Sequence, residues 1–483
     1  MTAALWTAEE AMHATAGRLA GPGGWKATGI SIDTRTLEPG DLFVALKGEA
    51  NDGHAYVAAA LSKGAAAALV DNDNDFAGPC LVVADTLKGV ADLGRVARAR
   101  ADVRALAVTG SIGKTGTKEA LAHALSRQAP THAARASFNN HIGVPVTLAR
   151  MPRDAVYGVF EVGMNHAGEI APLVAMIRPE VALITTVEAV HTENFADGIA
   201  GVAAAKGEIF SAGGPFAHGN PGTAVLPADS PFHDFLAARA REAGWGRTLG
   251  FGTHAKADAR LVDWTGDAEK GRARVELFGR ALDFEIGAPG RHWAMNLTGA
   301  LLAIAALGAD AEAAAASFAS IATPKGRGQR HTVSLPGGGT FLLIDDSYNA
   351  SPPSMRAAFA VLASAVLPAG GRRIAVLGDM LELGPQAGEL HESLAEALEA
   401  NRIDRVHCCG PNMRRLHGKL PARMRGVHAA NSADLEPAVL ADMRAGDAVT
   451  VKGSLGSKMG RIVEALRALG ATDTQGRRAA GGR

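Results

Sequence analysis

The residues with the clearest chemical potential form a glycine-rich turn, Gly110-Ser111-Ile112-Gly113-Lys114-Thr115-Gly116-Thr117. A strand-like apolar run at 104–108 precedes the turn, and a helix-like run at 118–125 follows it. Glycine lets the backbone approach a ligand closely, and the N–H groups that open a helix favour an anion. The Lys114 side chain can reach outer phosphates, and the Thr115 hydroxyl can bind Mg²⁺. The stretch predicts a nucleotide site formed by Gly110, Ser111, Gly113, Lys114, Thr115 and Gly116, with a plain strand–helix turn as the alternative.

Three further polar residues lie at or beyond the ends of apolar, strand-like runs. Glu161 ends the run at 156–160, His191 follows the run at 181–187, and Lys206 lies on a helix that begins near Gly198. A carboxylate there is costly unless it is paired or bound to a metal, so Glu161 is either a Mg²⁺ ligand or a salt-bridged loop acid. By composition alone, His191 reads as a packed or surface histidine, and Lys206 as a solvated lysine.

Other polar clusters are candidates for ligand contacts, each with a plain structural alternative. Asn139 and Asn140 precede a Gly–Pro break, Arg327 lies in a basic hinge, and Asp346 and Asn349 follow a strand-like run. A turn explains the paired asparagines equally well, and a solvated linker explains the arginine. A further polar group lies near the N-terminus and comprises Ser31, Asp33, Arg35, Lys47 and Asp52-Gly53-His54. These residues form either a ligand site or two solvated turns.

Length and composition limit the class of protein. The 483 residues correspond to about three domains. Lys plus Arg and Asp plus Glu are balanced at 49 each, whereas a nucleic-acid binder would carry a basic excess. The three cysteines cannot form a disulfide framework, so we expect a reducing cytoplasm. We expect no signal peptide and no membrane span, a helix capping box at Thr7 and Glu10, and a frayed tail from about Gly470.

The order of strand-like and helix-like runs predicts an α/β fold. Residues 1–84 form a small α/β unit, and strands then alternate with helices to about Phe251, as in a doubly wound, mainly parallel sheet. Short alternating runs between 259 and 286 predict antiparallel strands. A third α/β pattern, Rossmann-like, begins near Pro324. We therefore expect three domains at 1–84, 85–323 and 324–483.

The motif Gly-x-x-Gly-Lys-Thr at 110–115 resembles the ATP loop of the Mur ligase family, although that family usually has Asn at the place of Ile112 and Thr at the place of Gly116. The resemblance implies ATP and Mg²⁺ as cofactors, the latter bound by Thr115, Glu161, His191 and a carbamylated Lys206. It makes Lys114, Lys206 and His191 the catalytic residues. It further implies that Asn296 faces adenine, that Arg327, Asp346 and Asn349 complete the nucleotide site, and that Asn139 and Asn140 contact the substrate.

Motifs in the outer domains resemble particular members of that family. The stretch 39–48 is similar to an N-terminal domain that holds the UDP end of the substrate, which implies that role for Ser31, Asp33, Arg35, Lys47 and the 52–54 turn. The segments 377–384 and 451–454 are similar to members that add D-alanyl-D-alanine, and the Asp-Asn-Pro-Arg signature of the diamino-acid-adding members is missing.

The resemblance implies an ATP-dependent ligase that joins this dipeptide to a UDP-linked muramoyl tripeptide through an acyl phosphate, in peptidoglycan synthesis. We expect a monomer whose partners are small molecules, with neither nucleic acid nor membrane. The alternatives are another amide ligase of the family, and a nucleotide-binding ATPase or regulator.

Overall fold

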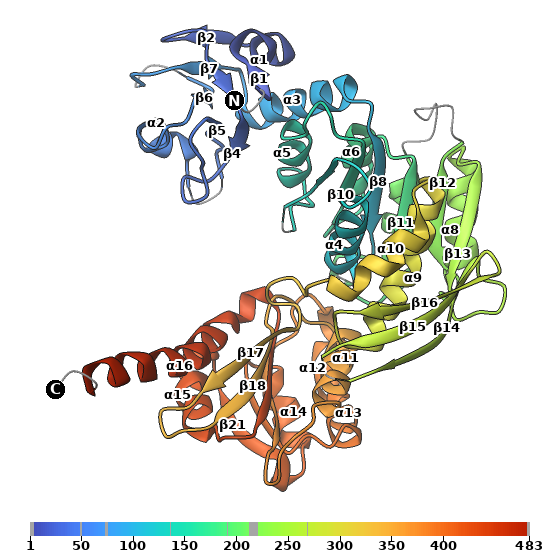
Figure 1. The fold of residues 1–483 in the computed structure, drawn as a ribbon, viewed down its shortest axis with the longest axis vertical. Helices are drawn as coiled ribbons and strands as arrows, with labels where there is room; N and C mark the ends of the chain where they lie inside the picture. The colour runs from blue at the N-terminus through green and yellow to red at the C-terminus, as the bar shows by residue number, and fades with distance from the viewer. Residues whose placement is uncertain are drawn as a thin grey trace.

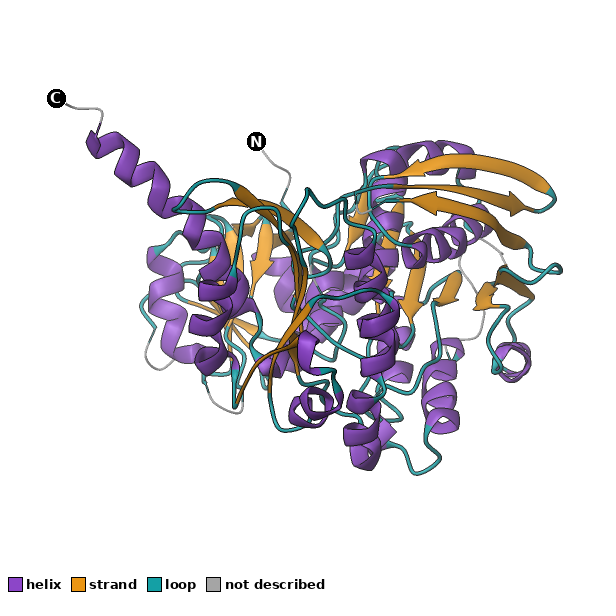
Figure 2. Cartoon of the chain, turned by 90° about the horizontal axis from the view of Figure 1, so that it is seen from below, coloured by secondary structure: helices purple, strands orange, loops and turns teal. Residues whose placement is uncertain are grey.

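The computed structural model describes residues 4–48, 51–72, 76–135, 137–190, 192–211, 221–267 and 269–480. Three α/β units follow one another along the chain, each built on its own main sheet (Figure 1). Seen at right angles to that view, helices flank the sheets (Figure 2). The expected fold class is therefore confirmed.

The N-terminal unit contains a five-stranded sheet in the order β2-β7-β6-β5-β4, parallel except for β2. Its elements are β1 (Trp6–Thr7), α1 (Ala8–Thr15), β2 (Arg18–Ala20), β3 (Lys26–Ala27), β4 (Gly29–Ser31), β5 (Asp41–Val44), α2 (Val57–Ser62), β6 (Ala67–Val70) and β7 (Cys80–Val82). The capping box of Thr7 and Glu10 is confirmed at the start of α1. The indole of Trp6 donates a hydrogen bond to the Ala149 carbonyl oxygen (2.9 Å), which fixes this unit against the next one.

The central unit contains a nine-stranded sheet in the order β16-β15-β14-β13-β12-β11-β8-β10-β9. Its first elements are α3 (Thr86–Arg100), β8 (Arg104–Thr109), α4 (Lys114–Leu125), β9 (Thr131–Ala133), α5 (Gly143–Ala149), β10 (Tyr157–Glu161), α6 (Ile170–Ile177) and β11 (Val181–Ile184). They are followed by α7 (Ile199–Gly207), β12 (Thr223–Pro227), α8 (His233–Glu242), β13 (Arg247–Gly252), β14 (Ala259–Gly266), β15 (Gly271–Leu277), β16 (Arg280–Ile286), α9 (Arg291–Ala306) and α10 (Ala311–Ser317).

Side chains of β8 alternate between the two cores of this sheet. Leu106 and Val108 pack with α4, α9 and α10, whereas Ala105 and Ala107 pack with α5, α6, α7 and α8. A strand buried on both faces reads as a continuous apolar run, which is why β8 was visible in the sequence. Because β10 and β11 both pair with β8 in parallel, the carboxyl ends of the three strands lie together at one end of the sheet, where ligands bind in such folds.

The C-terminal unit contains a six-stranded sheet in the order β17-β18-β22-β19-β20-β21, parallel except for β17. Its elements are β17 (Gln329–Ser334), β18 (Thr340–Asp346), α11 (Pro352–Ala363), β19 (Arg373–Gly378), α12 (Ala387–Glu392), α13 (Leu394–Ala400), β20 (Arg405–Cys409), α14 (Met413–Lys419), β21 (Arg425–Ala429), α15 (Ser432–Asp442), β22 (Ala448–Lys452) and α16 (Gly460–Ala480).

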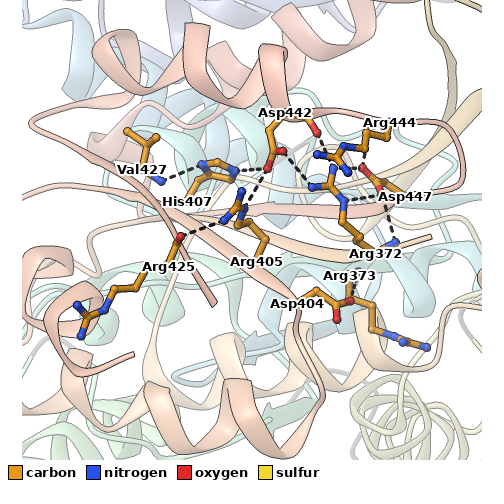
Figure 3. A network of polar contacts seen from close by, with 10 residues as sticks. All are labelled: Arg372, Arg373, Asp404, Arg405, His407, Arg425, Val427, Asp442, Arg444 and Asp447. Carbon is orange, nitrogen blue, oxygen red and sulfur yellow. Dashed lines mark hydrogen bonds and ion pairs between the residues drawn. The ribbon is translucent and has the colours of Figure 1, made fainter. Parts of the chain in front are cut away.

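A network of charged side chains joins the amino ends of the strands in this sheet (Figure 3). Arg372 donates to Asp442 (2.9 Å) and to Asp447 (2.7 Å), and both carboxylates are largely buried. Arg405 (3.3 Å) and His407 (3.0 Å) also donate to Asp442. The network closes the end of the sheet opposite the carboxyl ends of the strands.

Two local expectations were wrong. The tail from Gly470 continues as helix α16, which projects from the molecule (Figure 1). The segment contains three alanines and two arginines, which favour helices, beside its glycines and threonines. The segment 138–145, expected as a loop, enters α5 at Gly143, whose first turn tolerates Pro145.

Candidate active site

The glycine-rich turn joins β8 to α4 in the conformation that a phosphate cradle requires. Gly113 precedes α4 with φ +86°, and Gly110 has φ +147°. A Cβ atom at Gly110 would lie 1.9 Å from Thr185 Oγ1, so the loop packs against the end of β11. Lys114 donates to the Gly110 carbonyl oxygen (2.7 Å). Burial lowers the Lys114 pKa, while Glu161 nearby opposes that shift.

The two departures from the family loop have local structural partners. Ile112 donates its N–H to Thr186 Oγ1 (3.1 Å) and accepts a hydrogen bond from Thr185 Oγ1 (2.5 Å). A Cβ atom at Gly116 would lie 3.2 Å from Trp293 Cη2. The Trp293 indole therefore occupies the space into which a larger side chain at position 116 would extend.

Glu161 ends β10 as a buried carboxylate that lacks part of its hydrogen bonding. Its Oε1 accepts from the Asn139 amide (2.7 Å), whereas its Oε2 is buried and has no hydrogen-bond partner among the described residues. Only 1% of Glu161 is exposed. An unpaired buried carboxylate oxygen is costly, and a hard cation with oxygen ligands would satisfy it. The buried Thr115 hydroxyl lies 3.3 Å from Ser137 Oγ. This donor set fits Mg²⁺.

Lys206 lies near the end of α7 and is 2% exposed, so its expected solvated alternative is wrong. Burial, followed by repulsion from Lys114, lowers the Lys206 pKa well below its ordinary value. A neutral amine is thereby favoured. His191, the other expected metal ligand, lies outside the described residues. Within the described part of the chain, no three His, Cys, Asp or Glu residues form a metal cluster.

The C-terminal unit supplies the opposite wall. Lys452 donates to Asp346 (2.7 Å) and to the Asn349 carbonyl oxygen (2.9 Å), which holds both residues at the end of β18. Burial raises the Asp346 pKa, and Lys452 opposes that shift. The Arg327 guanidinium lies over the Tyr348 ring, 4.4 Å from its centroid, and Arg327 also donates to Ser137 Oγ (3.4 Å) across the gap.

The two walls enclose a cavity of about 590 Å³. Among the expected residues, it is lined by Ser111, Gly113, Lys114, Thr115, Gly116, Asn139, Glu161, Asn296, Arg327, Asp346 and Asn349. Asn296 lies against Gly113, where an added Cβ would be 2.7 Å from its Oδ1. His292 also lines the cavity. The cavity thus unites candidates from segments more than 200 residues apart.

A second, larger cavity of about 1210 Å³ adjoins the first between α4, the hinge and α16. Thr115, Ser137, Arg327 and Tyr348 line both spaces. A molecule in the larger cavity would therefore have access to a group held at the glycine-rich turn.

The residues predicted to contact the substrate, apart from Asn139, lie away from the cavity at the glycine-rich turn. Asp33 forms an ion pair with Arg35 (2.6 Å), and Lys47 pairs with Asp71 (2.6 Å) on the N-terminal unit. Ser31 is buried and donates to the Asp33 carbonyl oxygen (3.0 Å).

In the same unit, His54 bridges Asp52 (2.6 Å) and Asp71 (3.1 Å). On the central unit, Asn140 accepts from the N–H groups of Ile142 and Gly143, so its side chain oxygen orders the start of α5.

Three residues that line the cavity had no predicted role. Lys452 stood in a noted motif, Tyr348 stood beside the expected acids, and Trp293 followed His292. The buried end of an apolar strand was the available signal for Lys452.

In the described part of the chain, none of the helices combines the length and the apolar composition that a membrane span requires.

Comparisons with known proteins cover all three units. Family models match at residues 26–112 (Mur ligase family, catalytic domain), 108–304 (Mur ligase middle domain) and 326–455 (Mur ligase, glutamate ligase domain).

Two relatives named UDP-N-acetylmuramoyl-tripeptide–D-alanyl-D-alanine ligase align over nearly the whole chain. The Escherichia coli (strain K12) protein is 36% identical over 91% of this chain and 93% of its own length. The Rickettsia prowazekii (strain Madrid E) protein is 32% identical over 90% and 94%.

Solved structures show the same arrangement. MurF from Acinetobacter baumannii superposes with a TM-score of 0.80 at 29% identity, covering 96% of this chain and 99% of that one. MurF ligase from Thermotoga maritima in complex with ADP gives 0.73 at 25% identity, covering 93% and 98%. The chain belongs to the Mur ligase family.

Proposed function

We propose that the chain is an ATP-dependent ligase that joins D-alanyl-D-alanine to UDP-N-acetylmuramoyl-tripeptide in peptidoglycan precursor synthesis. The observation that carries the proposal is the cavity in which residues 111–116 of the glycine-rich turn face Arg327 and Asp346. The names of the relatives supply the substrates. The ADP complex of the Thermotoga maritima enzyme supports ATP as the nucleotide.

The reaction requires activation because a carboxylate is a poor acyl donor. A carboxylate oxygen of the tripeptide attacks the γ-phosphorus of ATP, and the bond from that phosphorus to the ADP oxygen breaks. The dipeptide amine, after losing a proton, attacks the acyl carbon. The bond from that carbon to the phosphate oxygen then breaks, giving amide, phosphate and ADP.

Lys114 and the N–H groups of the turn stabilise the charge of phosphoryl transfer. Lys114 donates to the Gly110 carbonyl oxygen, 2.7 Å away. A γ-phosphate would draw the ammonium away from that carbonyl. Each donor would contribute more in a site that excludes water than it would in solution.

Thr115, Glu161, His191 and Lys206 would hold one or two Mg²⁺ ions. Bound there, Mg²⁺ neutralises charge on the transferring phosphoryl group. The unpaired Glu161 Oε2 and the buried Thr115 hydroxyl support this assignment.

Lys206 would act as a metal ligand after carbamylation. Its neutral amine attacks CO₂, forms an N–C bond and loses one proton, which leaves an anionic carbamate. The burial of Lys206 and its lowered pKa support the neutral amine. We expect bicarbonate depletion at low pH to reduce ligation, and Lys206→Ala to abolish the bicarbonate dependence along with most activity. A fully active Lys206→Ala would contradict this role.

The remaining roles concern binding and closure. Asn296 would face adenine, and Arg327, Asp346 and Asn349 would complete the nucleotide site. Because these groups come from two units, nucleotide should draw the units together. Small-angle scattering should show compaction with ATP analogue and substrate, and unchanged dimensions would count against closure.

The N-terminal unit would bind the UDP end of the substrate through Ser31, Asp33, Arg35, Lys47 and the turn at 52–54. Asn139 and Asn140 would lie beside the substrate peptide. We propose domain limits at 1–84, 85–323 and 324–483, each of which contains one main sheet. A monomer in the cytoplasm fits small-molecule substrates and the three buried cysteines.

The decisive test of the function is ADP release with UDP-muramoyl tripeptide, with and without D-alanyl-D-alanine. We expect steady release only with both substrates, together with the amide product. Release that does not require the dipeptide would favour a plain ATPase. Release with another amino acid, in a panel that includes glutamate and diamino acids, would favour a different ligase of the family.

A further inference from the structure

The segment between Glu161 and α6 is held at both of its ends. It follows β10, and its residues Gly163, Met164 and Asn165 line the nucleotide cavity. Any shift of this segment would therefore move Glu161 relative to the glycine-rich turn. Two residues outside the segment, Asn139 and Glu208, restrain it.

Asn139 provides the first restraint, at the Glu161 end. Its side-chain amide donates to Glu161 Oε1 (2.7 Å), and its backbone carbonyl oxygen accepts from the Gly163 N–H (2.8 Å). A Cβ atom at Gly163 would lie 2.9 Å from Asn139 Cγ, so the two segments are in close contact.

Glu208 provides the second restraint, at the α6 end. Its Oε1 accepts from the Gly168 N–H (2.6 Å), and its Oε2 accepts from the N–H groups of Ile170 (3.2 Å) and Ala171 (3.3 Å). These N–H groups open α6 and lack partners within the helix. A carboxylate at that place gains both charge-assisted hydrogen bonds and the field of the helix.

Glu208 also stands two residues after Lys206, immediately beyond α7. The short connection and the three hydrogen bonds tie the backbone that carries Lys206 to the segment that begins at Glu161. The two side chains otherwise come from different strand–helix crossovers of the sheet.

We propose that Glu208 is a positioning residue that fixes the separation between Lys206 and Glu161, and with it the Mg²⁺ site. This inference rests on the proposed function of those two residues as metal ligands. Partners that orient metal ligands from outside the coordination sphere typically change metal affinity by about 10–100-fold when they are removed.

The test compares Glu208→Ala and Glu208→Gln with the wild-type chain. Glutamine keeps an acceptor oxygen but loses the charge, so it should rescue part of the effect. Asp229→Ala is the matched control, because Asp229 likewise accepts hydrogen bonds from N–H groups, those of Thr253 (2.7 Å) and His254 (2.9 Å), away from the cavity. Two quantities are measured in each protein: Mn²⁺ affinity in the presence of ADP, followed by electron paramagnetic resonance, and the Mg²⁺ concentration at half-maximal ligation.

We expect Glu208→Ala to weaken Mn²⁺ binding and to raise the half-saturating Mg²⁺ concentration, each by about tenfold. Glu208→Gln should show a smaller shift, and Asp229→Ala none. Unchanged metal affinity in Glu208→Ala, with faster hydrogen exchange at 168–171, would reduce Glu208 to a structural cap and overturn the proposal. If Glu208→Ala does not fold, Glu208→Gln decides the question. Metal affinity equal to that of the wild type, together with hydrogen exchange at 168–171 that is faster than in the wild type, would then overturn the proposal.

The failure of the proposed function would look different. In that case the wild type itself would show no ADP-dependent Mn²⁺ site, or Glu161→Gln would leave the site intact. A shift in Glu208→Ala beside an intact wild-type site therefore reports on positioning alone.

Discussion

Two polar regions of the chain differ in how completely their charges are matched. At the amino ends of the C-terminal strands, Arg372, Arg405, His407, Asp442 and Asp447 form a network in which donors meet carboxylates (Figure 3). Around the nucleotide cavity, Lys206 is buried with its pKa lowered by burial and by Lys114, and Glu161 Oε2 has no partner among the described residues. The paired charges of the network stabilise the fold, whereas the unpaired groups around the cavity are suited to binding a ligand.

The largest expected effect comes from removing the Lys114 ammonium. Lys114→Ala should slow ligation by about 1,000-fold, because it removes a preorganised donor from the site of phosphoryl transfer. The free energy of unfolding should stay constant or rise, since a desolvated cation is lost. Steady-state kinetics and urea unfolding of the same preparation measure both. Lost stability with retained activity would place Lys114 among the structural residues.

Removing the Arg372 side chain should have the opposite outcome. Arg372→Met leaves Asp442 and Asp447 without their main donor and should lower the free energy of unfolding by about 3 kcal/mol. The rate of ligation at saturating substrates should not change, because the network lies at the far end of the sheet. Urea unfolding provides the measurement, and Arg423→Met, which removes an exposed ion pair with Glu399, is the control.

The contact between Gly116 and Trp293 should produce the next smaller effect. Gly116→Thr introduces a side chain against the indole and should weaken ATP binding by about 30-fold through overpacking of the loop. Adding Trp293→Leu should restore much of the affinity by making room. Calorimetric titration with an ATP analogue measures each variant, and additive losses in the double variant would disprove the coupling.

The smallest effect is a pH dependence of the network. Burial lowers the His407 pKa below its ordinary value, although Asp442 opposes that shift. The unfolded chain then binds more protons, so stability is full above the unfolded pKa of about 6.5 and falls as the pH drops below it. We expect a loss of about 1 kcal/mol between pH 7 and pH 5 that His407→Gln reduces. Equal pH slopes in the two proteins would exclude His407 as the source.

The sequence predicted the elements whose signals are local. The apolar run at 104–108 predicts a strand, and β8 spans Arg104–Thr109. The short strand β9 lies at the edge of its sheet and is only half-buried, so it lacks an apolar run and was missed. The expected frayed tail from Gly470 is helical, because a glycine near the end of a helix need not stop it.

The candidate site could be predicted in part, because some of its residues also carry a local signal in the sequence. Glu161 and Asp346 end apolar strands, and that position marks the functional edge of a parallel sheet. The partners of these residues could not be predicted. Lys452 meets Asp346 across 106 residues of sequence, and Trp293 meets Gly116 across an interval that no local rule spans. Tertiary packing alone brings these pairs together.

The central claim is that the cavity around Lys114 converts a carboxylate into an acyl phosphate. It is tested most directly by labelling both carboxylate oxygens of the tripeptide with ¹⁸O and analysing the released phosphate by mass spectrometry. One ¹⁸O per phosphate is expected, because the bond from the acyl carbon to the transferred oxygen breaks when the amine attacks. Phosphate that carries no label, formed alongside amide, would contradict the account.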